Sequence, residues 1–578
     1  MTTVALELTQ LVRDAAEAMG HGDAPVPLEP CVPTQDARHG DYQSNFAFRL
    51  GKALRTNPRE VATKMVEAMG DSPLLAGAPE VAGPGFINFR LNADWAGGEL
   101  ARRTASPRFG TPQVGGDRVV VIDYSSPNVA KRMHIGHLRS TVIGDALHRL
   151  SEYVGYDVVA DNHIGDWGTP FGKLIVAWER ERNDEAFSAD PVGELQRLYV
   201  WFGEAAADDP ALLDEARAHT ARLQQGDPET QALWRLFVDA SMQEFDGVYA
   251  RLGVEFDEVL GESAYHPMLQ GATDRLLAQG LAEQDDGAVI SRFSADDGKG
   301  LKDKVLVIQK RDGAFTYGAS DVACVDYRVE RWQPAKVLYV VGMPQKQHFQ
   351  QVFCLAKKQG HTETELLHIG FGLLRFADGT KASSRSGGAL NLVDVLDEAV
   401  RRARAVVDAR EDDLAEEEKQ AIAEAVGLGA VKYADLSQNP ASDIIFDWDK
   451  ALAFQGNTAP YLMYAHARCC AILRRAGSPT GSSITPIPVA PEERDLVIGL
   501  LRFPELVLAA ASTHRPNLLA EYLYRVASSF STFYLACPVL KDGVSDSDRQ
   551  RRLAMVEATR LVLHDGLGLL GLGAPERM

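Results

Sequence analysis

The amino-acid sequence predicts an α/β protein with a doubly wound parallel sheet of the Rossmann-like kind, preceded by an α+β domain and followed by an all-α bundle. Three observations support this prediction. Short apolar strands and helices alternate between residues 111 and 397, as a doubly wound sheet requires. Residues 1–110 mix helical periodicity with strands around a Gly-Pro-Gly turn, whereas residues 398–578 carry helical patterns only. We therefore expect domains at 1–110, 111–397 and 398–578.

The composition is that of a globular protein of several domains, with 578 residues, 45% hydrophobic and 24% charged. The six cysteines form no Cys-x-x-Cys pair, so we expect neither structural zinc nor a disulfide framework, and a reducing cytoplasm fits. No stretch is expected to span a membrane, and the acidic first residues indicate an amphipathic helix instead of a signal peptide. The net charge of −20 by itself argues against a nucleic-acid partner, although a local basic surface can exist on an acidic protein.

The first domain contains clear helix signals. A helix is expected to end near Gly20, and Asn57 followed by Pro58 is a cap with a first-turn proline that opens a helix to about Met69. The segment EVAGPGFINFRL then predicts strands around its Gly-Pro-Gly turn. Nothing in these residues has the pattern of an enzyme site.

The central domain is predicted from runs of β-branched and apolar residues. The expected strands are Val119–Ile122, Asp157–Ala160, Val305–Ile308, Val337–Val341 and Leu367–Gly370. A charged, mostly helical insertion is expected at about 178–251, and its composition indicates solvated helices without chemistry of their own.

The loop after the first of these strands is the strongest candidate for a functional site. It joins the carboxyl end of a strand to a helix that is expected to stop at Gly155, and open α/β sheets bind nucleotides at such a position. The loop contains His134-Ile135-Gly136-His137. Two imidazoles three positions apart can face one ligand, and Gly136 removes the Cβ that would block a base or ribose. This suits ATP, and the alternative is that the histidines are solvated or form helix caps.

Two longer segments carry a resemblance to a known family. SSPNVAKRMHIGHLRST and the DNHIGDWGTPFG that follows it closely resemble arginyl-tRNA synthetases, which are class I aminoacyl-tRNA synthetases, and the resemblance extends over nearly the whole chain. It implies an arginine-tRNA ligase that forms arginyl-adenylate and pyrophosphate from L-arginine and ATP with Mg²⁺. The arginine then passes to the 3'-terminal ribose of its tRNA. The resemblance also implies a monomer.

The resemblance implies two groups of residues around ATP. The expected ATP-binding residues are Pro127, Asn128, Lys131, His134, Ile135, Gly136 and His137. The second ATP loop of class I synthetases, KMSKS, is here DGTKASSRSGG, in which Lys381 fits the first lysine and Ser384 replaces the second. Lys131, just before the histidine motif, and Arg385 are expected to substitute for the missing lysine. The expected catalytic residues are therefore His134, His137, Lys131, Lys381 and Arg385.

A carboxylate beside a phenol is the arrangement best suited to hold a guanidinium group. Tyr317 and Asp321 are four positions apart, on one face of an expected helix, and they match the family's guanidinium readers; the alternative is that Asp321 is an ordinary helix acid. By resemblance, the other residues expected to hold arginine are Asp123, Ser125, Asn128, His163 and Gln345, with Asp166 and His348 beside them. For His163, Asp166, Gln345 and His348 the alternative of caps and core hydrogen bonds is stronger.

The tRNA residues also come from the resemblance. Phe86 and Asn88 are expected to meet the D-loop at the tRNA elbow, unless Phe86 and Phe89 are strand core and Asn88 a turn residue. The residues expected to line an anticodon pocket are Tyr461, Tyr464, Arg468, Tyr534 and Met578. The alternative for this second set is that its aromatic side chains form part of the core of the helical bundle.

Two other functions stay open. The altered KMSKS loop is compatible with a tRNA-binding paralogue that lacks catalysis, although the intact histidine motif argues against it. A different class I synthetase, or a small-molecule adenylate former, is disfavoured by the pair Tyr317 and Asp321 and by the long helical bundle.

Overall fold

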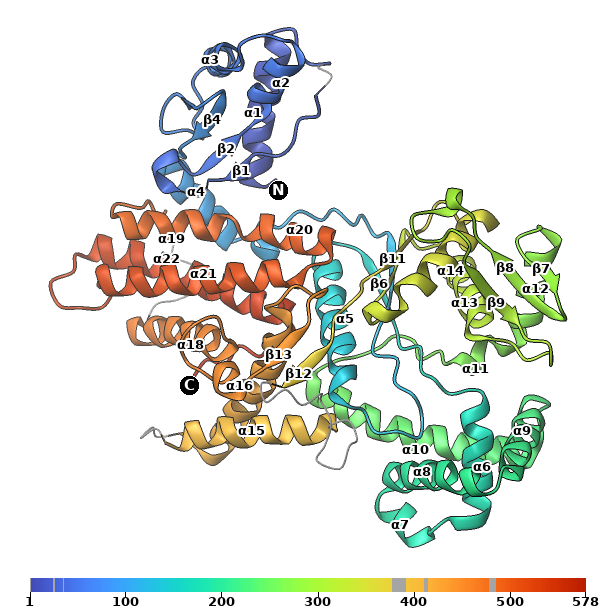
Figure 1. Ribbon diagram of the computed structural model, residues 1–578. Helices are drawn as coiled ribbons and strands as arrows, with labels where there is room; N and C mark the ends of the chain where they lie inside the picture. The colour runs from blue at the N-terminus through green and yellow to red at the C-terminus, as the bar shows by residue number, and fades with distance from the viewer. Residues whose placement is uncertain (1, 24–25, 35, 377–390, 410–413, 478–484) are drawn as a thin grey trace. The chain divides into compact units, whose positions relative to one another are not determined.

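The computed structural model describes residues 2–23, 26–34, 36–376, 391–409, 414–477 and 485–578 (Figure 1). These residues form two compact units. The first unit comprises residues 1–114, 407–429 and 452–578, and the second comprises 115–406 and 430–451. The first unit thus joins the amino-terminal domain to the carboxyl-terminal helices.

The second unit is built on a four-stranded parallel sheet, which confirms the predicted fold class. Its strand order is β11-β10-β5-β6. The strands are β5 (Val119–Asp123), β6 (Asp157–Asp161), β10 (Lys336–Tyr339) and β11 (Glu365–His368). The two interior residues Val121 and Ile122 have no exposed surface, as a strand covered on both faces requires. The carboxyl ends of β5 and β10 therefore meet at one edge of the sheet.

One predicted strand lies elsewhere. Residues 305–309 do form a strand, but they pair antiparallel in a separate three-stranded sheet, so their expected place in the parallel sheet is wrong. Val305 and Val307 are exposed while Leu306 and Ile308 are buried. This alternation is typical of an antiparallel sheet with one wet face. The strands of this sheet are β7 (Glu283–Asp285), β8 (Ala288–Arg292) and β9 (Val305–Gln309).

Helices surround both sheets of the second unit. Those near the parallel sheet are α5 (Ile135–Tyr153), α11 (Glu262–Tyr265), α12 (Leu269–Ala278), α13 (Tyr317–Trp332) and α14 (Lys346–Gln359). The expected helical insertion consists of α6 (Thr169–Glu181), α7 (Asp184–Ala189), α8 (Pro191–Asp208), α9 (Ala211–Gln224) and α10 (Pro228–Leu252). After the sheet come β12 (Leu374–Phe376), α15 (Leu392–Asp408), α16 (Glu416–Leu436), β13 (Ile444–Phe446) and α17 (Trp448–Ala451).

The amino-terminal part of the first unit contains a four-stranded antiparallel sheet of order β1-β2-β4-β3. Its elements are α1 (Val4–Ala18), β1 (Val32–Pro33), β2 (Tyr42–Ser44), α2 (Phe46–Ala53), α3 (Pro58–Met69), β3 (Glu80–Ala82), β4 (Phe86–Phe89) and α4 (Ala93–Thr104). The side chain of Asn57 caps α3 with Pro58 in its first turn, as predicted. The Gly-Pro-Gly turn joins β3 to β4, also as predicted.

The rest of the first unit is the expected helical bundle. Its helices are α18 (Ala459–Ala476), α19 (Pro491–Leu501), α20 (Phe503–Thr513), α21 (Pro516–Ala536) and α22 (Asp546–Leu569), together with the first part of α16. The amino-terminal part packs on this bundle through a half-buried carboxylate, Glu505, which accepts from the Ala5 N–H at 2.8 Å and the Tyr42 hydroxyl at 3.0 Å. These contacts explain why the two segments form one unit.

One stretch does have the length and apolar character of a membrane span, against the expectation. It covers Pro491–Thr513, at a mean hydropathy of 1.6. The stretch is two helices, α19 and α20, and Leu496, Val497 and Leu500 of the first and Phe503 and Val507 of the second are fully buried in the first unit. Core helices of soluble proteins have the same composition, so length and hydropathy alone did not separate the two cases here.

Candidate active site

The two histidines of the loop after β5 hold each other in place at the start of α5. His134 is the amino-terminal cap of this helix, and its Nδ1 accepts from the Gly136 N–H at 3.0 Å. The Nδ1 of His137 accepts from the His134 N–H at 3.1 Å, and the two rings stack with centroids 3.9 Å apart. A neutral imidazole whose Nδ1 accepts must carry its proton on Nε2. The histidines therefore form helix caps, as one of the two predictions from the sequence stated. Capping leaves each ring with an Nε2–H group that can donate to a ligand.

Both imidazoles are neutral at physiological pH. Burial lowers the pKa of His137 to about 3, with a smaller contribution from His134. Burial also lowers the pKa of His134, and the charge of Lys131 adds to this. Neutral donors attract phosphate oxygens less strongly than cations do. Their hydrogen bonds nevertheless strengthen as negative charge develops on those oxygens in the transition state.

Gly136 is required by the fold of the loop itself. A Cβ at this position would lie 2.8 Å from both Cε1 and Nδ1 of the His134 ring. Such a contact is too short for carbon, so a side chain would displace the imidazole. The glycine thus serves the histidine directly, in addition to the expected clearance for a base or ribose.

A pocket of about 240 Å³ lies beside the histidine loop. Its walls include Asn128, Lys131, Gly165, Tyr199 and Glu262. Lys131 is exposed, and its Nζ lies 4.5 Å from the centroid of the Tyr199 ring on α8. The pocket therefore already contains a cation of the kind that a triphosphate requires.

The remaining ATP residues fall into two groups. Pro127 and Ile135 are buried, and the Pro127 carbonyl accepts from the Gly165 N–H at 3.0 Å, which joins the loop after β5 to the loop after β6. Lys381 and Arg385 lie outside the described residues. The chain is described again from Asn391, which forms an antiparallel bridge with His134. Asn391 therefore lies beside the histidine loop.

The predicted guanidinium readers lie together on α13. Tyr317 is 65% exposed, and its ring packs edge-on against His348 of α14 at 4.7 Å between centroids. The carboxylate of Asp321, one turn along α13, is 2.5 Å from Nε2 of the same histidine. Phenol, carboxylate and imidazole thus form one cluster, and Gln345 is exposed at the start of α14.

Two residues expected to hold arginine are instead occupied within the protein. Asp123 accepts from Nη2 of the fully buried Arg328 at 2.8 Å and from the Ser126 hydroxyl at 3.0 Å. The Ser125 hydroxyl is buried and lies 2.8 Å from the hydroxyl of Tyr249. Direct contact of either side chain with a ligand would require exchange of these bonds.

Arg328 links the sheet to the guanidinium readers. Besides Asp123 it donates to Asp161 at 2.7 Å, so one side chain of α13 grips the carboxyl ends of both β5 and β6. Asp321 lies about two turns earlier on the same helix. The register of α13 on the sheet, and with it the position of Asp321, therefore depends on Arg328.

The loop after β6 has a structural role in part. Asp166 is buried and accepts from the Ser263 N–H at 2.8 Å and the Ser263 hydroxyl at 2.5 Å. Asp166 thereby fixes α11 in place, which agrees with the alternative prediction that this residue forms a cap or a core hydrogen bond. His163 is half-buried with its ring 5.3 Å from that of Tyr265, and Asn128 is exposed and bridges to Gly165.

Glu262 is a further candidate site residue, and no motif in the sequence indicates it. It lines the 240 Å³ pocket, and burial raises the pKa of its carboxyl to about 7, with added repulsion from Asp166 and Asp321. A carboxyl with a raised pKa in a pocket is typical of a functional site. It stands in a short helix with no motif around it, so only the folded chain brings it near Asp321.

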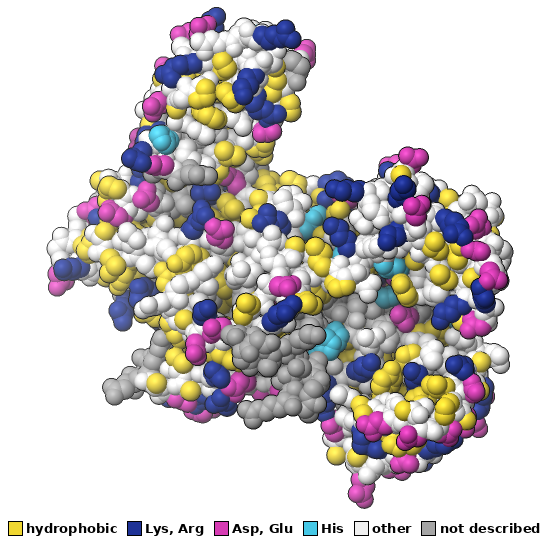
Figure 2. Space-filling view, viewed as in Figure 1, with side chains coloured by type: hydrophobic (Ala, Val, Ile, Leu, Met, Phe, Trp, Pro, Cys, Tyr) yellow, Lys and Arg dark blue, Asp and Glu magenta, His cyan; other side chains and the backbone are white. Residues whose placement is uncertain are grey.

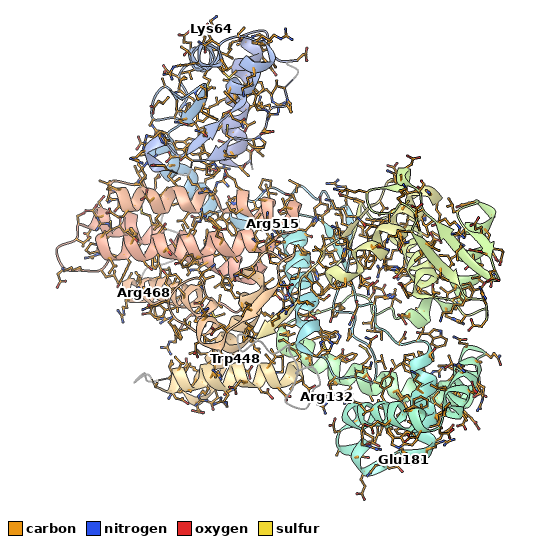
Figure 3. The ribbon with its side chains drawn as sticks, in the orientation of Figure 1. Lys64, Arg132, Glu181, Trp448, Arg468 and Arg515 are labelled. Atoms are coloured by element: carbon orange, nitrogen blue, oxygen red, sulfur yellow. The ribbon has the colours of Figure 1, made fainter. Side chains whose placement is uncertain are left out.

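The expected anticodon residues form a cluster on the bundle. The guanidinium of Arg468 on α18, labelled in Figure 3, lies 4.6 Å from the ring centroid of Tyr464 and 5.4 Å from that of Tyr534. Tyr461 bonds to Ser531 of α21 at 3.3 Å. The carboxyl-terminal tail, which ends at Met578, is attached to α18 because the Pro575 carbonyl lies 3.0 Å from Nδ1 of His466.

The expected elbow residues lie on β4. Phe86 is half-buried and stacks on Phe48 with centroids 5.5 Å apart. Asn88 is buried in the strand, where its side-chain oxygen accepts from Nε2 of Gln43 at 2.8 Å, and Phe89 is core. Only Phe86 of this pair presents surface to a tRNA, and Asn88 is a strand residue and not a turn residue.

On the face drawn in Figure 2, the basic side chains are interspersed with acidic ones. The net charge of −20 is therefore compatible with local contacts to phosphates.

Comparison with known proteins identifies the fold and the family. A methionyl-tRNA synthetase of Mycobacterium tuberculosis, 14% identical, shares the fold with a TM-score of 0.51 over 78% of this chain and 91% of its own. The family model described as tRNA synthetases class I (R), catalytic domain, matches residues 104–448, which contain the sheet and the histidine loop. Fold and site thus define a class I aminoacyl-tRNA synthetase. Arginine-tRNA ligases of Fusobacterium nucleatum and Saccharophagus degradans are each 40% identical over 99% or more of both chains. The chain belongs to the arginyl-tRNA synthetase family.

The other domains and the solved structures agree with this membership. The arginyl tRNA synthetase N terminal domain matches residues 6–91, and the DALR anticodon binding domain matches 462–578. The arginyl-tRNA synthetase of Thermus thermophilus, 26% identical, has a TM-score of 0.84 over 99% of this chain and all of its own. That of Plasmodium falciparum, 25% identical, has a TM-score of 0.82 over the whole of both chains.

Proposed function

We propose that the chain carries out the arginine-tRNA ligase reaction of its family with the residues of the cluster around the histidine loop. The carboxylate of L-arginine attacks the α-phosphorus of ATP in line, a new P–O bond forms, and the bond to pyrophosphate breaks. The 2'- or 3'-hydroxyl of the terminal tRNA ribose then attacks the arginyl carbonyl, and AMP leaves. Neither step needs a protein nucleophile, so catalysis consists of positioning and of stabilising charge.

The observation that carries the proposal is the fixed orientation of the two histidines. Their Nδ1 atoms are used in the loop, so both Nε2–H groups are available to phosphate oxygens as negative charge develops. The amino end of α5 adds partial positive charge, and Lys131 adds a full one. Lys381 and Arg385 would reach the triphosphate from the second loop.

Arginine would be held by the acids of the same unit. Asp321 and Tyr317 suit the guanidinium, and Glu262 adds a second carboxyl whose pKa of about 7 would fall beside a cation. Mg²⁺ is proposed to arrive bound to the phosphates of ATP. Among the described residues no three histidine, cysteine or acid side chains gather as ligands, and Mg²⁺ commonly keeps phosphate and water ligands.

For tRNA, Phe86 is proposed at the elbow and the cluster of Arg468 with its tyrosines at the anticodon. The domain limits 1–110, 111–397 and 398–578, a monomeric state and a cytoplasmic location are proposals that rest on the family.

Exchange between ATP and pyrophosphate, measured for each amino acid with and without tRNA, tests the proposal. Arginine alone should support exchange, and by resemblance only when tRNA is added. Asp321→Asn should raise the KM for arginine about 10²-fold or more, because it removes a charge from a bidentate ion pair. Glu330→Gln, at an exposed position of the same helix, is the control and should leave the KM unchanged. Tight tRNA binding without exchange would support the inactive paralogue instead.

A further inference from the structure

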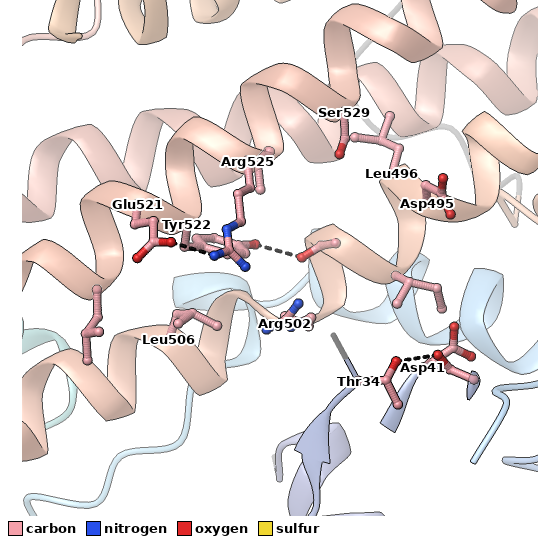
Figure 4. Close-up of a pocket in the computed structure, with 15 residues that line it drawn as sticks. Thr34, Asp41, Asp495, Leu496, Arg502, Leu506, Glu521, Tyr522, Arg525 and Ser529 are labelled. Carbon is pink, nitrogen blue, oxygen red and sulfur yellow. Dashed lines mark hydrogen bonds and ion pairs between the residues drawn. The ribbon is translucent and has the colours of Figure 1, made fainter. Parts of the chain in front are cut away.

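We propose that a pocket in the first unit, remote in sequence from the histidine loop, binds one phosphodiester of the tRNA backbone. The pocket has a volume of about 400 Å³ and lies between α19, α20 and α21 on one side and the segment around Thr34 and Asp41 on the other (Figure 4). All of its lining residues belong to the first unit. The volume is ample for a phosphate group.

The donors of the pocket come from two arginines. Arg502, at the junction of α19 and α20, is half-buried, and its Nε is buried without a hydrogen-bond partner among the described residues. Arg525 points from α21 toward Arg502 in Figure 4. A buried N–H of a charged group that lacks an acceptor is destabilising, and an anionic oxygen that accepts from it removes that penalty. Two guanidinium groups aimed at one space are the usual means of holding a phosphate.

Arg525 can change partners at little cost. It pairs with Glu521 at 2.5 Å, but the two side chains are 65% and 52% exposed. Exposed ion pairs contribute little to stability. A phosphate can therefore replace Glu521 as the acceptor.

The charges of the lining select a ligand with a single negative charge. Asp41 is already neutralised, since it accepts from Arg494 at 2.5 Å and from the Leu91 N–H at 2.7 Å. Asp495 is an exposed acid of the lining, and Glu505 lies close enough to Arg502 for the arginine's charge to lower its pKa against the effect of burial. Asp41, Asp495 and Glu521 thus offset Arg494, Arg502 and Arg525, so each further negative charge on a ligand meets more acids than free arginines, and the monoanion of a phosphodiester is favoured over a triphosphate or a citrate.

The source of the phosphodiester follows from the walls. One wall matches the arginyl tRNA synthetase N terminal domain and the others match the anticodon binding domain. Since the pocket is lined by both of these domains, we take a tRNA bound to both as the source of the phosphodiester. This step rests on the proposed function, since it takes tRNA as the partner.

The salt dependence of tRNA binding tests the inference on the full chain. Each phosphate contact contributes about 0.7–0.9 to the slope of log K against log salt concentration. Arg502→Gln and Arg525→Gln should each lower the slope by about this amount and weaken binding several-fold. Arg515→Gln is the matched control, because Arg515 is exposed at the start of α21, outside the pocket, and is labelled in Figure 3. Its slope should equal that of the wild type.

A second variant guards against misfolding. Glu521→Gln removes the acceptor that competes for Arg525, so it should tighten tRNA binding, which a folding defect does not do. The Tm in inorganic phosphate, compared with the Tm in chloride at equal ionic strength, tests whether the pocket binds a free anion. If it does, phosphate raises the Tm of the wild type but not that of Arg502→Gln. If the salt-dependence slope of tRNA binding is unchanged in both Arg502→Gln and Arg525→Gln, the proposed phosphodiester site is wrong, even if phosphate raises the Tm. Normal charging of tRNA with arginine by these variants would leave the proposed function intact. Failure of the wild type to bind tRNA overturns both.

Discussion

His137 allows the role of a neutral donor to be measured. In the structure this side chain does two things: Nδ1 accepts from the His134 N–H at 3.1 Å, and Nε2 carries a proton for the ligand. His137→Ala removes both. His137→Gln keeps an acceptor at the third helix position, where glutamine forms capping boxes, and so removes mainly the Nε2–H.

The expected magnitudes differ for the two variants. Loss of one donor that acts in the transition state lowers the rate of adenylate formation by about 10²–10³, or roughly 2.7–4 kcal/mol. His137→Ala should in addition lose about 1 kcal/mol of stability with the cap, while His137→Gln should not. Single-turnover adenylate formation measures the first effect, and denaturant unfolding measures the second.

The pKa of about 3 adds a pH dependence. An unfolded histidine titrates near about 6.5, so between these two values the unfolded chain binds a proton that the folded chain does not. The free energy of unfolding should therefore fall below pH 6.5, by at most about 1.4 kcal/mol per pH unit from this group. Because glutamine does not titrate, the stability of the wild type relative to His137→Gln should decrease as the pH is lowered.

Two outcomes would refute this reasoning. A rate of adenylate formation within about twofold of wild type would remove His137 from the reaction. A wild-type to variant rate ratio that declines as the pH rises from 6 to 8 would show that the imidazolium, and not the neutral ring, is the donor.

Two further substitutions test the support of the site. Gly136→Ala places a methyl group 2.8 Å from the His134 ring, so the imidazole must move; adenylate formation should slow about 10- to 100-fold with an unchanged KM for arginine, and a normal rate in stopped flow would contradict the packing argument. Arg328→Lys keeps the charge but loses the fork that joins Asp123 to Asp161, so the KM for arginine should rise about 10-fold while the KM for ATP stays within twofold. Equal changes in both constants, with a lowered Tm, would indicate a general loss of structure instead of a positioning role.

Features that depend on near neighbours could be predicted from the sequence. The start of α5 at the histidine motif, the cap of α3 by Asn57, and the common face of Tyr317 and Asp321 all follow from spacing along a helix. Backbone geometry sets these distances whatever the rest of the chain does. The resemblance then supplied the family, because its motifs are contiguous stretches.

Features that depend on distant partners were decided by the tertiary structure. Asp123 and Ser125 stand on the predicted loop, yet their bonds go to Arg328 and Tyr249, which are 205 and 124 positions away. Glu262 enters the site for the same reason, and β9 joins an antiparallel sheet because one of its faces is wet. The sequence by itself determined which side chains stand at the edge of the sheet. Packing decided which of them are already hydrogen-bonded to other residues, because a buried polar group requires a partner and the tertiary structure determines which partner is near.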